Sequence, residues 1–267
     1  MIGKVRRLQR ILNASGRSII VPMDHGFTLG RIAGIKQIGS SIDKLTQSSV
    51  DALVMHKGTI IKHYETLQKS NVGLLLHISG STNLCNLSNR KVLVSSVEEA
   101  IRLGCDGVSM HVNLGGEYES EMIHDFGIIS DECNKKGMPL LAMIYAKSEG
   151  KSKVGHAIQV AYEMGADMVK VGFDGDYESF AEEVEGAGLP VFVAGGERCA
   201  EEDLFKMLCT IFSTTTVSGI SMGRNVFQSN HIDETLQVIK GIVYEQATLE
   251  ESIELYHKLV TLNRDKE

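Results

Sequence analysis

A lysine stands in the middle of a short apolar stretch, "MGADMVKVGFDGD", which runs from residue 164 to residue 176. Met168, Val169 and Val171 predict a buried strand, so Lys170 is expected to lie inside the fold. An unpaired ammonium group in an apolar interior is very unfavourable, and lysine is among the residues least often fully buried. Desolvation or a nearby cation favours the neutral amine, which attacks a carbonyl carbon to form a Schiff base. Lys170 therefore predicts aldolase chemistry, unless its side chain reaches solvent or the strand register is one residue off.

The elements that must position this lysine recur along the chain. Four phrases share a small or polar turn and a short apolar run: "SSVDALVMHKG", "LGCDGVSMHVN", "MGADMVKVGFD" and "TTVSGISMGRN". Four more apolar runs lie between them: "SIIVPMDHG", "VGLLLHISG", "MPLLAMIYAK" and "LPVFVAGG". Helical spacing fills several gaps, as in "SKVGHAIQVAYEMG", where Gly165 is expected to end the helix.

Strands that alternate with helices indicate parallel βαβ units, and eight of them predict an α/β fold, a single (β/α)8 TIM barrel over residues 1–267. An open doubly wound sheet is the alternative, but no G-x-G-x-x-G follows the first strand. The segment between His56 and Gly73 is short for a full crossover helix. If the four phrases are alternate barrel strands, Lys170 faces the interior near the C-terminal mouth, level with Val54, Ser109 and Ser221.

Other polar residues follow the expected strands, where barrel active sites lie. Asp24 could pair with Lys170 or accept a proton, although it could also cap a turn before Gly26. Tyr145 could act as a general acid or base, or pack as an aromatic at the rim. Lys147 follows in the expected loop, where it could bind an anion. We add His25 and Thr28, beside Asp24, to the expected substrate-binding residues.

Glycines end strands 7 and 8 in "VAGG" and "SMGRN". Backbone amides at Gly195, Gly196 and Gly223 could approach a phosphate closely, with Arg224 adding charge and a forked set of donors. A rival reading starts from histidines near the ends of strands 1 to 4, which could bind a metal: His25, His56, His77 and His111. Carboxylate ligands are sparse at strands 5 to 8, and a metal would not explain the lysine, so we expect no metal and no cofactor.

The formal charge of −7 argues against nucleic acid or an anionic membrane as the main partner. Five cysteines without a C-x-x-C pair fit reduced thiols in a cytoplasmic protein. The N-terminal "MIGKVRRLQRIL" lacks the apolar core of a signal peptide, and no apolar run reaches membrane-spanning length. We therefore expect one soluble domain.

Several phrases resemble the archaeal-type class I aldolases of the DeoC/fructose-bisphosphate aldolase group, in the right order over most of the chain: "IVPMDHG", "MHKG", "VGLLLHISG", "SSVEEAIRLGCDGVSMHVN", "VAGG" and "GRNVFQ". The resemblance implies a (β/α)8 barrel without a metal cofactor, with Lys170 as the Schiff-base lysine. It also implies Tyr145 as proton donor, Asp24 as proton acceptor, and a homo-oligomer that can reach a decamer.

Within that group the chain is most similar to the heptulosonate synthases, which implies a phosphorylated ketose or dihydroxyacetone phosphate as donor and L-aspartate 4-semialdehyde as acceptor. The stretches "AKSEG" after Tyr145 and "VGFDGD" after Lys170 depart from the family pattern, in loops expected to contact substrate. A synthase of bacterial secondary metabolism that uses dihydroxyacetone phosphate, a fructose-bisphosphate aldolase and a thiolase remain alternatives. A sugar-phosphate-binding barrel without turnover is the alternative that is not an enzyme.

Overall fold

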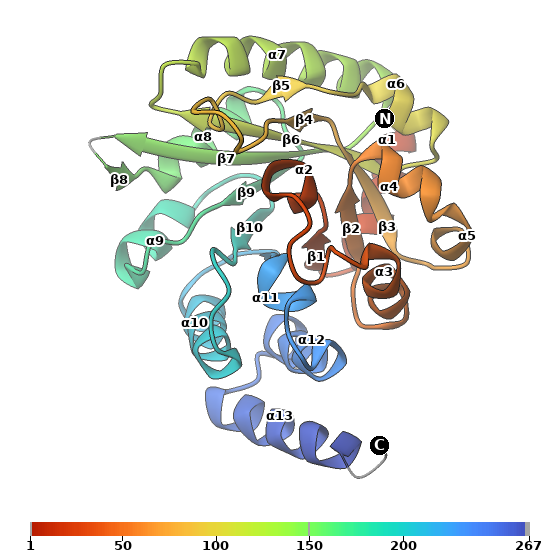
Figure 1. The fold of residues 1–267 in the computed structure, drawn as a ribbon. Helices are drawn as coiled ribbons and strands as arrows, with labels where there is room; N and C mark the ends of the chain where they lie inside the picture. Colours follow the sequence, from red (N-terminus) through yellow and green to blue (C-terminus); the bar gives the residue numbers. More distant parts are fainter. Residues whose placement is uncertain (1, 149, 265–267) are drawn as a thin grey trace.

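A closed barrel of parallel strands forms the centre of the protein in the computed structural model, which describes residues 2–148 and 150–264 (Figure 1). Over these residues eight strands follow one another around the barrel, and pairing of β6 with β7 closes it. The barrel strands are β1 (Ser18–Pro22), β2 (Ala52–Met55), β3 (Gly73–His77), β6 (Gly107–Leu114), β7 (Leu140–Ser148), β9 (Met168–Val171), β10 (Val191–Ala194) and β11 (Gly219–Ser221). All eight apolar runs predicted as strands are confirmed, and the chain folds as a (β/α)8 TIM barrel.

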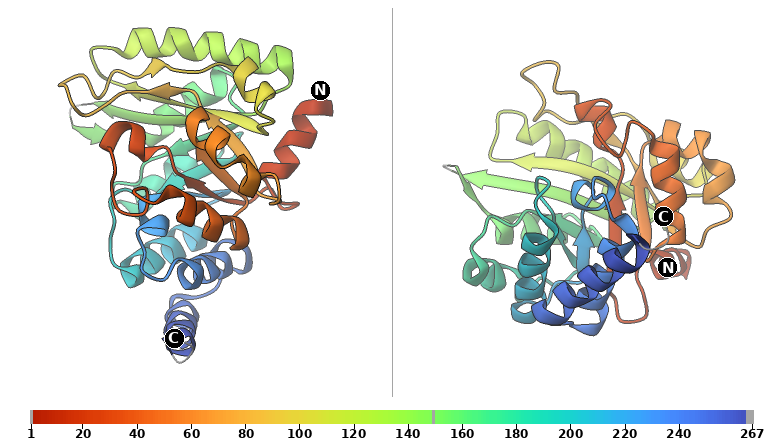
Figure 2. Two further views of the ribbon diagram at one scale, coloured as in Figure 1. Left: turned by 45° about the vertical axis from the view of Figure 1, so that its right-hand side comes forward. Right: turned by 60° about the horizontal axis from the view of Figure 1, so that its bottom comes forward.

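Helices connect the strands and pack around them, as two further views show (Figure 2). They are α3 (Ile38–Gln47), α4 (Lys57–Lys62), α5 (Tyr64–Leu67), α6 (Val97–Arg102), α7 (Glu119–Lys136), α8 (Val154–Glu163), α9 (Tyr177–Val184), α10 (Glu201–Thr214) and α12 (Ile232–Lys240). The helix predicted before Gly165 is confirmed as α8, and Gly165 has a φ of 75°. The short crossover between His56 and Gly73 holds two small helices, α4 and α5, in place of one.

Further elements lie at the two ends of the barrel and at the C-terminus. They are α1 (Ile2–Ile11), α2 (His25–Leu29), β4 (Ser79–Gly80), β5 (Val92–Leu93), β8 (Lys151–Ser152), α11 (Arg224–Phe227), the π-helix η1 (Gly241–Glu245) and α13 (Leu249–Arg264). No helix within the described ranges is both long enough and apolar enough to cross a membrane.

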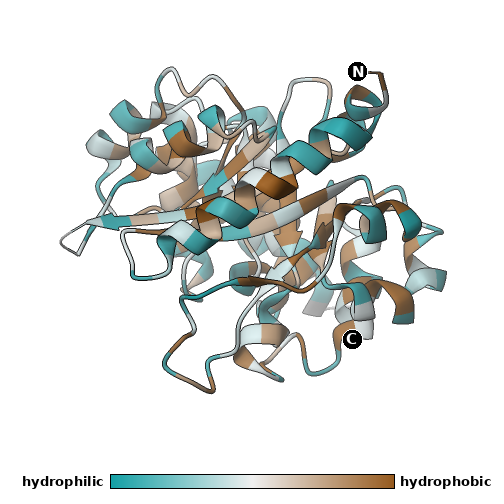
Figure 3. Cartoon of the chain, turned by 90° about the horizontal axis from the view of Figure 1, so that it is seen from above, coloured by the Kyte–Doolittle hydropathy of each residue, from teal (hydrophilic) through white to brown (hydrophobic). Residues whose placement is uncertain are grey.

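Hydrophobic side chains fill the barrel interior towards the N-terminal ends of the strands, so that a site can form at the C-terminal ends. Side chains from alternating strand positions pack inside it: Ile20, Ala52, Val54, Leu75, Leu141, Met143, Met168 and Phe192. Helix α1 covers the N-terminal end, where Ile11 joins this inner cluster and its carbonyl accepts a hydrogen bond from Ser18 Oγ at 2.6 Å. Seen from above, the strands are mostly hydrophobic, whereas the helices combine hydrophobic and hydrophilic sides (Figure 3). Helix α1 thus covers the N-terminal end, and the C-terminal mouth is the end where a ligand can reach the interior.

Candidate active site

Lys170 points into the barrel. On β9 it pairs in register with Phe192 of β10 and Met143 of β7, which both belong to the inner cluster. Paired residues on neighbouring strands turn their side chains to the same face, so Lys170 shares the interior with them. Only 7% of the residue is exposed. The lysine is therefore inside the fold, as the sequence predicts, and does not extend to the outer surface.

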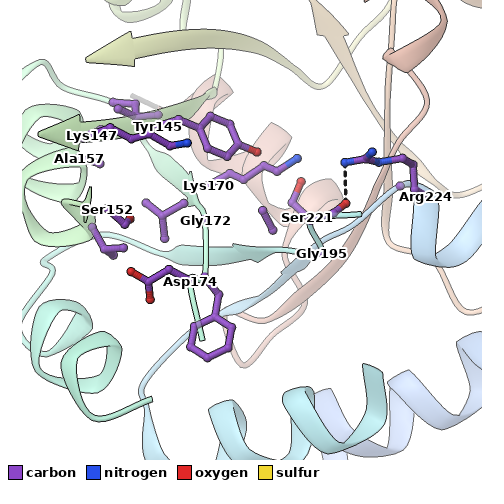
Figure 4. A pocket seen from close by; sticks show the side chains of 18 of the residues that line it. Tyr145, Lys147, Ser152, Ala157, Lys170, Gly172, Asp174, Gly195, Ser221 and Arg224 are labelled. Atoms are coloured by element: carbon purple, nitrogen blue, oxygen red, sulfur yellow. Dashed lines mark hydrogen bonds between the residues drawn. The ribbon is translucent and has the colours of Figure 1, made fainter. Parts of the chain in front are cut away.

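A cavity of about 420 Å³ opens above this lysine, at the C-terminal ends of β7, β9, β10 and β11. Most of the predicted site residues line it: His25, Tyr145, Lys147, Lys170, Gly195, Gly196, Gly223 and Arg224. Figure 4 shows Lys170 between Tyr145 on one side and Ser221, Gly195 and Arg224 on the other. Asp24 and Thr28 are not among the lining residues in the described chain, and Thr28 lies on α2, where its carbonyl accepts a hydrogen bond from Asn83 N.

Asp24 occupies the N-cap position of α2 but does not cap the helix, because its side chain makes no capping hydrogen bond. Its Oδ1 lies 3.6 Å from His25 Nδ1, and its Oδ2 lies 3.6 Å from His77 Nε2. Burial alone would raise the pKa of the Asp24 carboxyl, but the positive potential from His77, His25 and Lys170 holds that pKa well below its ordinary value. Asp24 is thus a carboxylate held within the field of the Lys170 amine.

Burial lowers the pKa of the histidines around Asp24, which are His25, His56 and His77. Burial lowers the pKa of His77 to about 4, and its Nδ1 lies 2.8 Å from Ser109 Oγ. Burial and the charge of Lys91 lower the pKa of His111 to about 3. No group of three His, Cys, Asp or Glu side chains among the described residues is arranged to share a metal ion. Lys91 and Lys170 add to the positive potential around the Asp24 carboxylate.

Lys91 lies near Asp24 and the histidines of the site, and the sequence did not predict this position. It lies just before β5, in the excursion between β3 and α6, and its Nζ donates to Ser81 Oγ at 2.7 Å. Its ammonium acts on Asp24, His77 and His111. The surrounding "NRKVLV" has no periodic pattern that would place a side chain over the barrel mouth.

Tyr145 stands beside the lysine on the neighbouring strand. It follows the inward-facing Met143 by two residues on β7, so it faces the same way. Its ring centroid lies 5.0 Å from that of His111. The backbone of Gly172 passes close to the ring, and a Cβ there would meet Tyr145 carbons at 3.6 Å, an ordinary contact. The phenol is therefore held at the cavity wall between His111 and the Gly172 segment.

The ends of β10 and β11 form the other wall of the cavity. Gly196 adopts a φ of 62°, which glycine takes without a steric penalty. Arg224 Nη2 donates to the Gly196 carbonyl at 2.8 Å, which is the dashed line in Figure 4. A Cβ at Gly223 would come within 2.5 Å of His25 Cε1 and would overlap the Pro22 carbonyl. Glycine is therefore required at Gly223 because the Pro22 backbone approaches too closely for a side chain, and it is favoured at Gly196 because of the positive φ.

Asn225 holds this wall in place, and the sequence did not single it out. The residue is 2% exposed. Its Nδ2 donates to the carbonyls of Gly195 and Glu197 at 2.7 and 3.1 Å, and its Oδ1 accepts from Cys199 N at 2.9 Å. One amide side chain therefore fixes the loop after β10 against α11. In the sequence, only the position of Asn225 directly after Gly223 and Arg224 could have indicated this role.

Four buried polar atoms around the cavity have no hydrogen-bond partner among the described residues: Asp24 Oδ1, His25 Nδ1, Ser221 Oγ and Arg224 Nε. Buried polar groups in native proteins are nearly always hydrogen-bonded. Both donors and acceptors are represented, and they come from β1, β11 and the segments that follow them. Such a set suits a ligand that offers hydroxyl, carbonyl and phosphate oxygens.

A barrel with a buried lysine at its mouth, beside a tyrosine and a glycine-rich wall, defines a class of enzymes that form Schiff bases with carbonyl substrates. Comparison with known proteins gives the family. The model of the DeoC/LacD family aldolases matches residues 18–229, so the chain belongs to this family.

Two curated relatives and one solved structure show how close the likeness is. The chain is 38% identical over 263 residues to 2-amino-3,7-dideoxy-D-threo-hept-6-ulosonate synthase 1 of Archaeoglobus fulgidus, covering 97% of this chain and 98% of that protein. It is 34% identical over 249 residues to 2-amino-4,5-dihydroxy-6-oxo-7-(phosphonooxy)heptanoate synthase of Streptomyces griseus, covering 91% of this chain and 90% of the other.

The solved structure is an archaeal fructose-1,6-bisphosphate aldolase whose catalytic lysine is covalently bound to the carbinolamine intermediate of its substrate. It superimposes with a TM-score of 0.80 at 27% identity, over 90% of this chain and 99% of that one. The chain is therefore a class I, lysine-dependent aldolase.

Proposed function

We propose that this aldolase joins a phosphorylated ketose or dihydroxyacetone phosphate unit to L-aspartate 4-semialdehyde, as 2-amino-3,7-dideoxy-D-threo-hept-6-ulosonate synthase does. Lys170 forms the Schiff base, and Asp24 and Tyr145 move the protons. Gly195, Gly196, Gly223 and Arg224 hold the donor phosphate. The 38% identity to the Archaeoglobus enzyme over nearly the whole chain supports this choice of substrates.

The observation that carries the proposal is the position of the Lys170 amine. It lies on the cavity wall between Tyr145 and the glycine-rich wall with Arg224 (Figure 4). A donor whose phosphate contacts Arg224 would bring a carbonyl two or three bonds away towards this amine. Held in this way, the amine and the carbonyl react as an intramolecular pair, which lowers the entropic part of the barrier.

The proposed steps use these residues in turn. The Lys170 amine adds to the donor ketone to give a carbinolamine, and loss of water gives an iminium ion. With dihydroxyacetone phosphate, Asp24 accepts a proton from the carbon next to the iminium. With a larger ketose, Asp24 accepts the proton of the hydroxyl one carbon further on, and the bond between these two carbons breaks to release an aldehyde. Both routes give the same kind of enamine, because the iminium nitrogen takes up the electron pair. The enamine carbon then attacks the aldehyde, Tyr145 protonates the new alkoxide, and water hydrolyses the iminium to free Lys170.

Borohydride trapping tests the proposal. The enzyme is incubated with each phosphorylated donor, reduced with borohydride, and analysed by intact mass and peptide mapping. We expect a mass increase on Lys170 with the true donor and none in Lys170→Met. The substitution Lys153→Met, at an exposed lysine just before α8, is the control and should still give the adduct. An adduct on another lysine, or no adduct with any donor, contradicts the proposal.

The Streptomyces relative favours a second candidate, in which dihydroxyacetone phosphate itself is the donor and the product belongs to secondary metabolism. Supplying L-aspartate 4-semialdehyde with each donor in turn separates the two activities, because only the matching donor yields product. A barrel that binds sugar phosphate without turnover would show a donor complex and no product with any aldehyde.

We also propose a cytoplasmic homo-oligomer. Helix α13 projects from the barrel in Figure 1 and in the left view of Figure 2, and it exposes Leu255 and Leu262. We place α13 in a subunit contact, because exposed leucines on a projecting helix are stabilised by burial against a second copy. Light scattering on the full chain gives the subunit number, and a monomer contradicts this assignment.

A further inference from the structure

The end of the cavity away from Arg224 carries one basic and one acidic side chain. It is lined by Lys147 and Ser152, from the β7–β8 hairpin, and by Asp174, from the loop between β9 and α9. Figure 4 shows the Asp174 carboxylate and Ser152 on this side, with Lys170 between them and Arg224. A donor phosphate at Arg224 therefore leaves the acceptor to bind beside an ammonium group and a carboxylate.

The hairpin brings Lys147 to this wall. The sequence predicted that Lys147 lies in a loop, but β7 continues through it, and Lys147 pairs with Ser152 of β8. The extension exists because β6 and β7 pair as far as Ala146, and the chain then folds back on itself as an antiparallel hairpin. A strand fixes the direction of a side chain better than a loop does.

Asp174 has little structural role, unlike the second acid in its loop. Asp176 caps α9, because its Oδ1 accepts a hydrogen bond from Ser179 N at 3.1 Å. Asp174 is exposed and accepts one weak hydrogen bond, from Asp176 N at 3.3 Å. None of the ion pairs formed within the described residues includes Asp174 or Lys147. Both charges are therefore free to bind a ligand.

A carboxylate at this position discriminates between acceptors. It repels the phosphate of an aldehyde such as glyceraldehyde 3-phosphate and attracts an ammonium group. Lys147 attracts a carboxylate in the same region. An α-amino acid carries both an ammonium group and a carboxylate on one carbon atom, so it matches the two side chains together.

We infer that Asp174 and Lys147 bind the ammonium and carboxylate groups of an α-amino aldehyde, and so select a zwitterionic acceptor over a phosphorylated one. The inference rests on the proposed function, in which Lys170 carries the donor. It adds the residues that bind the acceptor, and it assigns a role to the stretches after Tyr145 and Lys170, which are expected from the sequence to contact the substrate.

The experiment compares two aldehydes that differ only in the amino group: L-aspartate 4-semialdehyde and succinic semialdehyde. We expect Asp174→Asn to lower kcat/KM for the amino aldehyde about 5- to 20-fold, the range for a charge-assisted hydrogen bond in a partly exposed site. The value for succinic semialdehyde should stay within about 2-fold, because that aldehyde lacks the group that Asp174 binds. Lys147→Gln should lower both values, because both aldehydes carry a carboxylate.

Matched controls come from the same two loops. Asp176→Asn removes an acid two residues away, and asparagine caps helices as well as aspartate does. Lys151→Gln removes a lysine on β8 that does not line the cavity. Neither should change the ratio between the two aldehydes. Equal losses for both aldehydes in Asp174→Asn, no loss for either, or a preference of the wild type for glyceraldehyde 3-phosphate would each overturn the inference.

A separate measurement tests the proposed function, so the two proposals can fail independently of each other. This measurement detects the borohydride adduct of the wild-type enzyme with donor alone, before any aldehyde is added. An enzyme that forms this adduct on Lys170 but does not distinguish the two aldehydes keeps the proposed function and loses the acceptor assignment.

Discussion

Replacing Gly223 by alanine tests whether the glycine-rich wall is built by close backbone approach. The added Cβ would lie 2.5 Å from His25 Cε1 and 2.8 Å from Phe227 Cε1, and would overlap the Pro22 carbonyl. Real Cβ contacts almost never fall below 3.0 Å, so the ends of β1 and β11 must separate by at least about 0.5 Å. The Pro22 carbonyl belongs to a barrel strand and cannot rotate away as a side chain could.

We expect Gly223→Ala to cost about 1–3 kcal/mol of stability, the range for overpacking a well-packed site. For a chain of this size that lowers Tm by roughly 2–10 °C. The same displacement moves His25 and Arg224, so KM for the donor should rise about tenfold or more, because small errors in position are costly in active sites.

Thermal unfolding at fixed protein concentration and donor kinetics measure the two effects. Gly172→Ala is the matched control for stability, since a Cβ there meets the Tyr145 ring only at 3.6 Å. It should change Tm by less than about 2 °C, as expected where the added carbon meets no clash. A Gly223→Ala variant with unchanged Tm and unchanged donor KM would refute the argument that close packing at Gly223 shapes the proposed phosphate site.

Three further predictions concern single side chains. Tyr145→Phe should slow product formation about 10²- to 10⁴-fold, the usual contribution of a general acid, while the borohydride adduct on Lys170 still forms; loss of the adduct would assign the phenol to donor binding. Asn225→Ala should raise donor KM and cost about 1–3 kcal/mol in denaturant unfolding, because it leaves part-buried backbone groups such as the Gly195 carbonyl without their partner; a loss below about 0.5 kcal/mol would contradict its role. His77→Gln should flatten the pH dependence of stability between about pH 6.5 and 4. The folded state keeps His77 neutral down to about pH 4, whereas the unfolded chain protonates it near pH 6.5, so wild-type stability falls across this window by roughly 3 kcal/mol from this residue. Urea titrations at several pH values measure that slope, and identical slopes in the two proteins would contradict the assignment.

The barrel could be predicted from the sequence because its strands are buried on both faces. Each then appears as a short continuous apolar run between turn residues, and eight such runs alternate with helical patterns. The period of two along a strand also fixed the direction of Lys170 relative to Met168, without knowledge of the neighbouring strands. The direction of Tyr145 follows in the same way from Met143.

The irregular segments at the barrel mouth could not be predicted in this way. Asp24 occupies a capping position, and only the positions of His25 and His77 show that its carboxylate faces the site. Thr28 is four residues further on but lies on α2, away from the cavity wall. Lys147 was expected in a loop, and its strand conformation depends on pairing with Ser152.

By itself, the sequence determined the number of barrel strands, the alternation of strand and helix, and the burial of one lysine, because local periodicity encodes which face of an element is apolar. The tertiary structure decided which side chains meet that lysine. Asn225 is fixed by hydrogen bonds to the loop at Gly195–Cys199, and Asp174 meets the cavity only because the loop after β9 lies beside the β7–β8 hairpin. Such contacts join residues far apart in the chain, and no local pattern records them.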